Sequence, residues 1–121
     1  MQDFFDLCQQ IKIGTVLHIT SNNSEYTLSG FGANRNNEAV LKYKISEANS
    51  KSITRTELMI LWDTLSDKGE INFKEIEDNN VELFRSGGCY RSIFKGLVKM
   101  LKPEFSFVEK KKGRTVSFLI V

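Results

Sequence analysis

The sequence predicts an α+β fold, in which an N-terminal helix and a three-stranded antiparallel meander precede a second half that ends in a β-hairpin. Short alternating or β-branched runs, separated by turn residues, occupy residues 15–45. A helix start and apolar residues at helical spacing follow at 54–65. Two β-prone runs flank a lysine-rich turn within residues 105–120. The chain length fits one domain, or two small lobes that share a core.

The composition indicates a globular protein of the cytoplasm. Forty per cent of the 121 residues are hydrophobic, and nine of them are phenylalanines, which is enough for a core. No apolar run approaches the roughly 18–20 residues of a membrane helix, and the first residues are acidic where a signal peptide is basic. We therefore expect no membrane partner. Cys8 and Cys89 belong to no CxxC or Cys/His cluster, so we also expect reduced thiols and no metal.

Residues 1–52 form the first predicted part. Asp3 is placed to cap a short amphipathic helix that ends at Gly14. Strands are expected at 15–20, 25–31 and 38–45, with turn and loop residues between them. In the last of these strands lysines alternate with apolar residues, which is typical of a half-buried strand.

Residues 46–52 are linker-like, and the character of the chain changes after them. Thr54 and Glu57 match a capping box, in which a threonine oxygen and a glutamate satisfy free amides at a helix start. Apolar residues recur at helical spacing from Leu58, so we expect Trp62 on the buried face. A short strand at "EIN" and a short helix at "FKEIEDNN" follow.

The helix predicted from Ser86 to about Lys102 carries a basic stripe. Its members lie at i, i+4, i+8 and i+11 and fall within an arc of roughly 80°; they are Arg91, Lys95, Lys99 and Lys102. The opposite side of this helix is apolar, and no acidic residue lies on the helix to pair with the bases.

The charge is divided unevenly along the chain. Residues 1–84 hold 8 Lys/Arg and 13 Asp/Glu, a net of −5, whereas residues 85–121 hold 9 Lys/Arg and 2 Asp/Glu, a net of +7. Such asymmetry favours a polyanionic partner for the basic half. The tip of the C-terminal hairpin concentrates this charge around Gly113, which supplies the positive φ of a tight turn. The alternative is that the tip lysines only discourage edge-to-edge sheet association.

The order helix, short strand, short helix, longer helix and β-hairpin over residues 53–121 resembles a winged helix-turn-helix DNA-binding domain. The motifs that carry the resemblance are "GEINFKEI", the helix at 86–102 and "FSFVEKKKGRTVSFLIV". The resemblance implies a winged-helix-like half in which the third helix enters the major groove and the basic hairpin tip contacts the backbone. The connection "VELFRSGG" is longer than a tight helix-turn-helix needs. Residues 1–52 resemble no family.

The residues before and within the basic helix complete the predicted site. Ser86 and the first amides of the helix are placed to bind a phosphate, with arginines on either side. The alternative is a glycine-containing helix start whose Tyr90 lies in the core. The predicted nucleic-acid-binding residues are Arg85, Ser86, Tyr90, Arg91, Lys95, Lys99, Lys110, Lys111, Lys112 and Arg114.

These observations predict a non-enzymatic module that binds nucleic acid, with duplex DNA favoured, as a regulator or a mobile-element accessory protein. No catalytic set is apparent, and we expect neither a cofactor nor a metal. His18 is the only histidine, and the carboxylates at 75–78 are typical of a solvated acidic helix. The alternative is a protein-interaction or inhibitor module without nucleic-acid binding. Residues 1–52 could also serve a homodimer or a protein partner.

Overall fold

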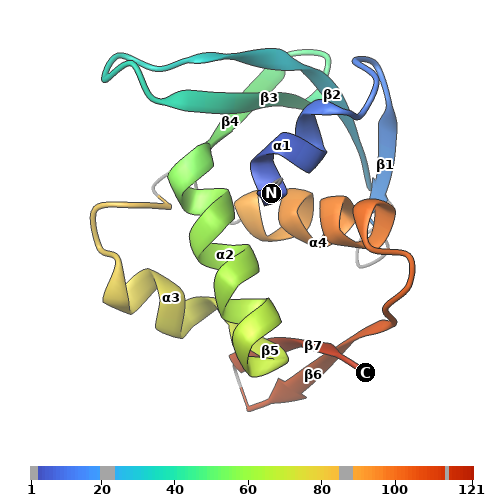
Figure 1. Cartoon of the computed structure of the whole chain (residues 1–121), viewed down its shortest axis with the longest axis vertical. Helices are drawn as coiled ribbons and strands as arrows, with labels where there is room; N and C mark the ends of the chain where they lie inside the picture. The colour runs from blue at the N-terminus through green and yellow to red at the C-terminus, as the bar shows by residue number, and fades with distance from the viewer. Residues whose placement is uncertain (1–2, 20–23, 85–88, 114) are drawn as a thin grey trace.

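The fold is α+β with antiparallel sheets, as predicted. The computed structural model describes residues 3–19, 24–84, 89–113 and 115–121. One sheet has the strand order β1-β2-β3-β4, and the other has the order β5-β7-β6. Figure 1 shows the first sheet at the top and the second at the bottom, with α1 and α4 beneath the upper sheet and α2 running from one sheet to the other.

The elements follow one another along the chain with these bounds: α1 (Phe4–Gln9), β1 (Val16–Ile19), β2 (Ser24–Ala33), β3 (Ala39–Ser46), β4 (Asn49–Thr54), α2 (Arg55–Lys68), β5 (Glu70–Asn72), α3 (Phe73–Asn79), α4 (Cys89–Leu101), β6 (Phe107–Lys112) and β7 (Thr115–Ile120).

Helix α1 begins at the predicted cap but is shorter than predicted. Asp3 Oδ1 accepts a hydrogen bond from the Asp6 amide at 2.8 Å, which satisfies a free donor of the first turn. Asp3 also forms an ion pair with Arg55 at the start of α2. The helix ends at Gln9, because the chain turns before Gly14, whose φ is +93° and whose amide donates to the Leu28 carbonyl at 2.8 Å.

The upper sheet contains the three predicted strands and one that the sequence did not indicate. The alternation in β3 is confirmed, since Leu41 and Tyr43 are buried while Lys42 is exposed. Strand β4 occupies part of the stretch predicted as a linker. It pairs with β3 along its length, so that Lys42 lies opposite Ser52. The linker prediction for 49–52 was therefore wrong, because pairing with β3 makes a strand of polar residues.

Helix α2 begins at the predicted capping box. The Glu57 amide donates to Thr54 Oγ1 at 3.0 Å, and the Thr54 amide donates to Glu57 Oε1 at 2.9 Å, which completes the capping box. Gly69 ends the helix in the left-handed region with φ +75°, and its amide donates to the Leu65 carbonyl. The buried Phe84 amide donates to the second carboxylate oxygen of Glu57 at 2.6 Å.

Trp62 lies at the edge of the core rather than inside it. Its ring stacks on Phe4 with centroids 5.1 Å apart, and it is only half-buried. Lys102 Nζ lies 5.1 Å from the centre of the Trp62 ring. Trp62 therefore joins α1, α2 and the end of α4.

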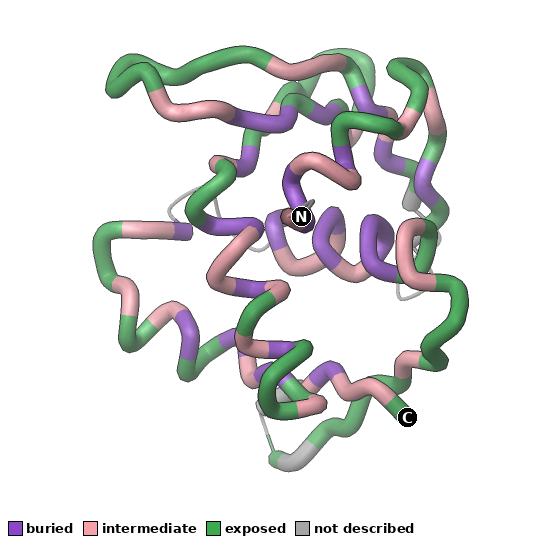
Figure 2. Tube along the Cα trace, viewed as in Figure 1, coloured by how far each residue is buried: buried purple, intermediate pink, exposed green. Residues whose placement is uncertain are grey.

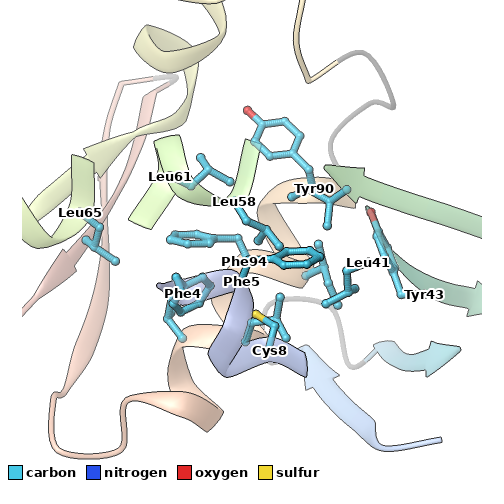
Figure 3. Packing of buried hydrophobic residues seen from close by; sticks show 14 of the residues in the cluster. Phe4, Phe5, Cys8, Leu41, Tyr43, Leu58, Leu61, Leu65, Tyr90 and Phe94 are labelled. Carbon is cyan, nitrogen blue, oxygen red and sulfur yellow. The ribbon is translucent and has the colours of Figure 1, made fainter. Parts of the chain in front are cut away.

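One hydrophobic cluster draws on both halves of the chain. It includes Leu41 of the upper sheet, Phe118 of the lower sheet and Phe94 of α4. Figure 2 shows the buried residues gathered along α4 and on the segments around it. Figure 3 shows Phe4, Phe94 and their neighbours in close contact between the helices and the upper sheet. Helix α4 is thus the centre of a core that residues 1–52 and 53–121 share.

The C-terminal hairpin is present, and its first strand extends further into the turn than predicted. Strand β6 runs to Lys112, so the lysines at 110–112 belong to a strand rather than to the turn. Gly113 has φ +63° in the turn, as predicted for that position.

Candidate nucleic-acid interface

The apolar side of α4 is enclosed by the rest of the protein. Its buried residues are Tyr90, Ile93, Phe94, Gly96, Leu97 and Val98, and the helix contacts β1 and α1. Tyr90 is 1% exposed, and its ring lies 4.6 Å from Phe84 and 6.0 Å from Phe73 between centroids. The Tyr90 side chain is therefore part of the core and does not contribute to an outer surface, which corrects its predicted place in the site.

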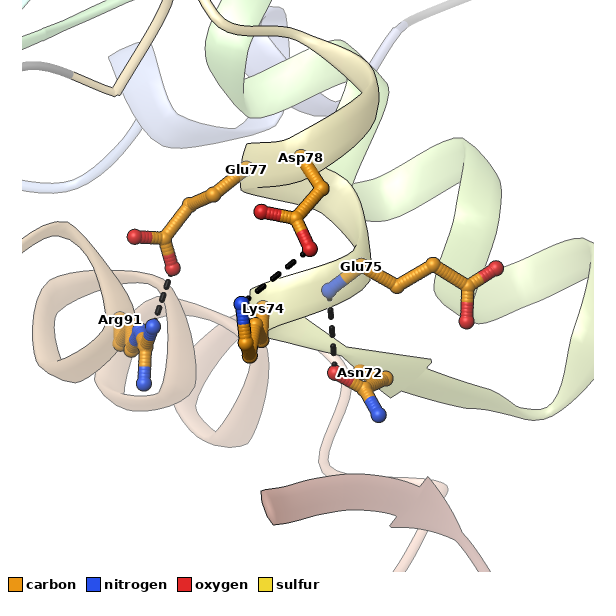
Figure 4. A network of polar contacts seen from close by, with 6 residues as sticks. All are labelled: Asn72, Lys74, Glu75, Glu77, Asp78 and Arg91. Carbon is orange, nitrogen blue, oxygen red and sulfur yellow. Dashed lines mark hydrogen bonds and ion pairs between the residues drawn. The ribbon is translucent and has the colours of Figure 1, made fainter. Parts of the chain in front are cut away.

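Arg91 forms an ion pair with Glu77 of α3 (Figure 4). Both side chains are 36% exposed, and the Arg91 guanidinium lies 5.6 Å from the centre of the Phe73 ring. Burial is the largest single influence on Arg91 and disfavours its charged form, but the contributions of Glu77 and Tyr90 together outweigh it, so the pKa of Arg91 is raised. Arg91 thus fastens α3 to α4.

Figure 4 also shows how α3 is held at its own ends. Asn72 Oδ1 accepts a hydrogen bond from the Glu75 amide at 3.1 Å, which caps the helix. Lys74 and Asp78 form an exposed i,i+4 ion pair at 3.3 Å. Of the carboxylates on this short helix, Asp78 thus pairs within the helix and Glu77 pairs with Arg91 of α4.

Lys95, one turn further along α4, forms an ion pair with Glu109 of β6. Its side chain is only 15% exposed, so the pair joins α4 to the hairpin in a partly shielded position. Lys102 contacts Trp62 as described above, and Lys99 is exposed and also has an interaction within the chain. Each member of the basic stripe is therefore engaged within the protein, with acidic partners for Arg91 and Lys95 supplied by other elements.

The sequence carries only a weak signal for these partners. A helical wheel describes one helix, whereas Glu77 and Glu109 come from α3 and β6. The register of the hairpin places Glu109 opposite Phe118, which is fully buried, so Glu109 faces α4 and the core. An acidic residue at an inward position of a hairpin strand is the feature that could have indicated an internal partner.

The hairpin presents the exposed positive charge. Lys110 and Lys111 are exposed and lie opposite Ser117 and Val116 of β7. Successive residues of a strand project to opposite faces, so these two lysines carry charge to both faces of the hairpin. Of the other predicted site residues, Arg85, Ser86 and Arg114 lie outside the described residues, and Lys112 is described by its backbone alone.

Strand β6 also forms an edge of the lower sheet, since the order is β5-β7-β6. Lysines on an edge strand disfavour pairing with other sheets. Protection of this edge is therefore the alternative explanation for the lysines of the hairpin. Large apolar side chains are nevertheless exposed nearby: Phe105 is 41%, Val108 42% and Val121 75% exposed.

The two cysteines are free thiols in different surroundings. Burial raises the pKa of the Cys8 thiol to about 12. Cys89 is half-buried at the start of α4, beside the hydroxyl of Tyr26. Within the described ranges, no three His, Cys, Asp or Glu side chains gather in a group that could hold a metal ion.

Comparisons with family models, curated proteins and solved structures gave no match for this chain. The order of elements over residues 53–121 is the predicted one, from α2 through β5, α3 and α4 to the β6–β7 hairpin. Membership of the winged-helix family remains a prediction that rests on this order. Among the described residues, no helix is long and apolar enough to cross a membrane.

Proposed function

We propose that this protein binds nucleic acid without catalysing a reaction, and that the β6–β7 hairpin makes the principal contact. The observation that supports the proposal is the exposure of Lys110 and Lys111 on both faces of a projecting hairpin. Clustered lysines repel one another, and a phosphate backbone relieves that repulsion while counterions are released. Duplex DNA is the favoured partner because the hairpin occupies the place of a wing in the predicted fold.

Helix α4 has a positioning role in this proposal. Arg91 and Lys95 are held by Glu77 and Glu109, and reaching a base edge would require both pairs to break. Their contacts instead fix α3 and the hairpin against α4. We therefore expect the contacts to fall mainly on the phosphate backbone, with little discrimination between sequences.

The test is a map of amide chemical shifts on titration of the labelled protein with a random-sequence duplex. The proposal predicts that the largest changes fall on β6 and β7 around Lys110 and Lys111. The double variant Lys110→Gln/Lys111→Gln should lose these changes. The double variant Lys12→Gln/Lys74→Gln removes the same charge from exposed positions elsewhere and should keep them. Absence of any shift with duplex or single-stranded DNA or RNA would refute the proposal.

A second candidate function is the binding of a protein partner along the edge of β6. It is favoured by the exposed side chains of Phe105, Val108 and Val121 beside that edge. This candidate predicts that Val108→Asp abolishes partner binding, whereas Lys110→Gln/Lys111→Gln leaves it unchanged. The nucleic-acid proposal instead predicts that Lys110→Gln/Lys111→Gln weakens duplex binding, whereas Val108→Asp leaves duplex affinity unchanged.

A further inference from the structure

We propose that the outer face of the upper sheet carries a separate oxyanion site that binds a phosphate group. A recess of about 450 Å³ lies on this face and is lined by Ser29, Lys42, Ser50, Lys51 and Ser52. Three serines and two lysines border this hollow, and no carboxylate lines it. Lys51 lies opposite the buried Tyr43, on the other face of β4 from Ser50 and Ser52, so Lys42 is the lysine that shares a face with the serines of β4.

The pairing of the strands explains why these residues meet. Lys42 of β3 lies opposite Gly30 of β2 on one side and Ser52 of β4 on the other. Lys44, two residues further along β3, lies between Thr27 and Ser50. Residues two apart in a strand project from the same face. Lys42 and Lys44 therefore lie next to each other on this face, and each is flanked across the sheet by glycine or by residues with hydroxyl groups.

A bulge in β2 adds the third hydroxyl. The register shifts between Leu28 and Gly30, so Ser29 is an extra residue without a partner on β3. A bulge re-aims a side chain, and here Ser29 lines the recess beside Lys42. Gly30 adopts φ +151°, a conformation that residues with side chains rarely take, and leaves the space above it open.

Gly32 leaves room for the lysine side chain on the same face. A Cβ atom at Gly32 would lie 3.0 Å from Lys42 Cε and 3.1 Å from its Nζ. The Lys42 side chain therefore lies across Gly32, and a larger residue there would displace the ammonium group. The two glycines and the bulge together shape the recess around Lys42.

The chemistry of the lining favours a phosphate. Lysine binds phosphate as a compact point charge, and serine hydroxyls donate hydrogen bonds to phosphate oxygens. The nearest carboxylates of this face, Glu25 and Glu47, line a neighbouring recess together with Lys44. They line the neighbouring recess rather than this one, so Lys42 supplies the positive charge on this face of the site.

This site is independent of the function proposed for the hairpin. The upper sheet and the β6–β7 hairpin lie at opposite ends of the molecule (Figure 1). The phosphate could belong to a small phosphorylated molecule or to a nucleic-acid backbone that reaches the sheet. The two sources share one chemistry, and the experiment separates them.

The probe is inorganic phosphate, followed by amide chemical shifts at constant ionic strength against sodium chloride. We expect saturable shifts centred on Ser29, Lys42 and Ser52. Lys42→Gln should weaken phosphate binding by about tenfold, the loss of one charge-assisted hydrogen bond. The matched variant Lys74→Gln, on exposed α3, should bind phosphate as the wild type does. Both lysines are exposed, so both variants should fold.

Duplex affinity of the same two variants identifies the source of the phosphate. A loss of duplex affinity in Lys42→Gln, but not in Lys74→Gln, supports a nucleic-acid backbone. Phosphate binding with unchanged duplex affinity supports a small phosphorylated ligand. Shifts no larger than those caused by chloride, or no effect of Lys42→Gln on phosphate binding, would overturn the proposal whatever the hairpin binds.

Discussion

Replacing Glu57 should destabilise the protein more than any other single change to an acidic side chain among the residues described. Glu57 is 8% exposed and accepts hydrogen bonds from two amides, those of Thr54 at 2.9 Å and Phe84 at 2.6 Å. One bond closes the start of α2, and the other anchors the segment after α3, where Phe84 has a positive φ of 60°. The side chain therefore ties two separate parts of the backbone together.

The magnitude follows from what each amide loses. Phe84 is 5% exposed, so in Glu57→Ala its amide stays buried without a partner, at a cost of about 1–3 kcal/mol. Thr54 is half-buried, so water can partly replace its lost bond and the cost there is about 0.5–1 kcal/mol. The total is about 1.5–4 kcal/mol. Glu57→Gln keeps one acceptor oxygen and should cost about half as much.

The measurement is urea unfolding followed by circular dichroism, with the midpoint and slope compared between variants. Glu104→Ala removes an exposed glutamate and should change the free energy of unfolding by less than about 0.5 kcal/mol. A Glu57→Ala variant that loses under about 1 kcal/mol, or a Gln variant that loses as much as the Ala variant, would show that the two amides find other partners.

Three further predictions concern single contacts. A double-mutant cycle on Lys95 and Glu109 should give a coupling of about 1 kcal/mol that shrinks at high salt, and zero coupling would mean the pair does not hold the hairpin. At pH 8 a thiol reagent should label Cys89 well before Cys8, whose pKa is raised by burial; equal rates by mass spectrometry would contradict this. The carboxyl group of Asp3 accepts a hydrogen bond from the Asp6 amide and lies beside the Arg55 guanidinium, and both contacts lower its pKa. Its charge therefore stabilises the protein above about pH 4, and this contribution is lost as the pH falls through the lowered pKa. Asp3→Asn should thus destabilise at pH 7 and have little effect at pH 2, and an equal loss at both would refute this.

Features that depend on near neighbours in sequence were predictable. The cap at Asp3, the capping box of Thr54 and Glu57, and the positive φ of Gly69 and Gly113 each follow from a few adjacent residues. Their physics is local, because a helix end or a tight turn satisfies its own backbone groups within one turn of chain.

Features that depend on distant pairing were not predictable. Strand β4 is polar and becomes a strand through its ladder with β3. The helical wheel of α4 separated its basic and apolar sides. It could not indicate the ion pairs with Glu77 and Glu109, because these residues belong to α3 and β6. The same limit applies to Trp62, whose place at the edge of the core depends on Phe4 and on Lys102.

The dependence of duplex affinity on salt tests most directly whether the hairpin contacts nucleic acid. Each phosphate contact contributes about 0.9 to the slope of log affinity against log salt. The proposal predicts salt-dependent binding by the wild type and a slope lower by about two in Lys110→Gln/Lys111→Gln, with no change in Lys12→Gln/Lys74→Gln. Duplex affinity that does not depend on salt, or a slope that the hairpin variant leaves unchanged, would contradict it.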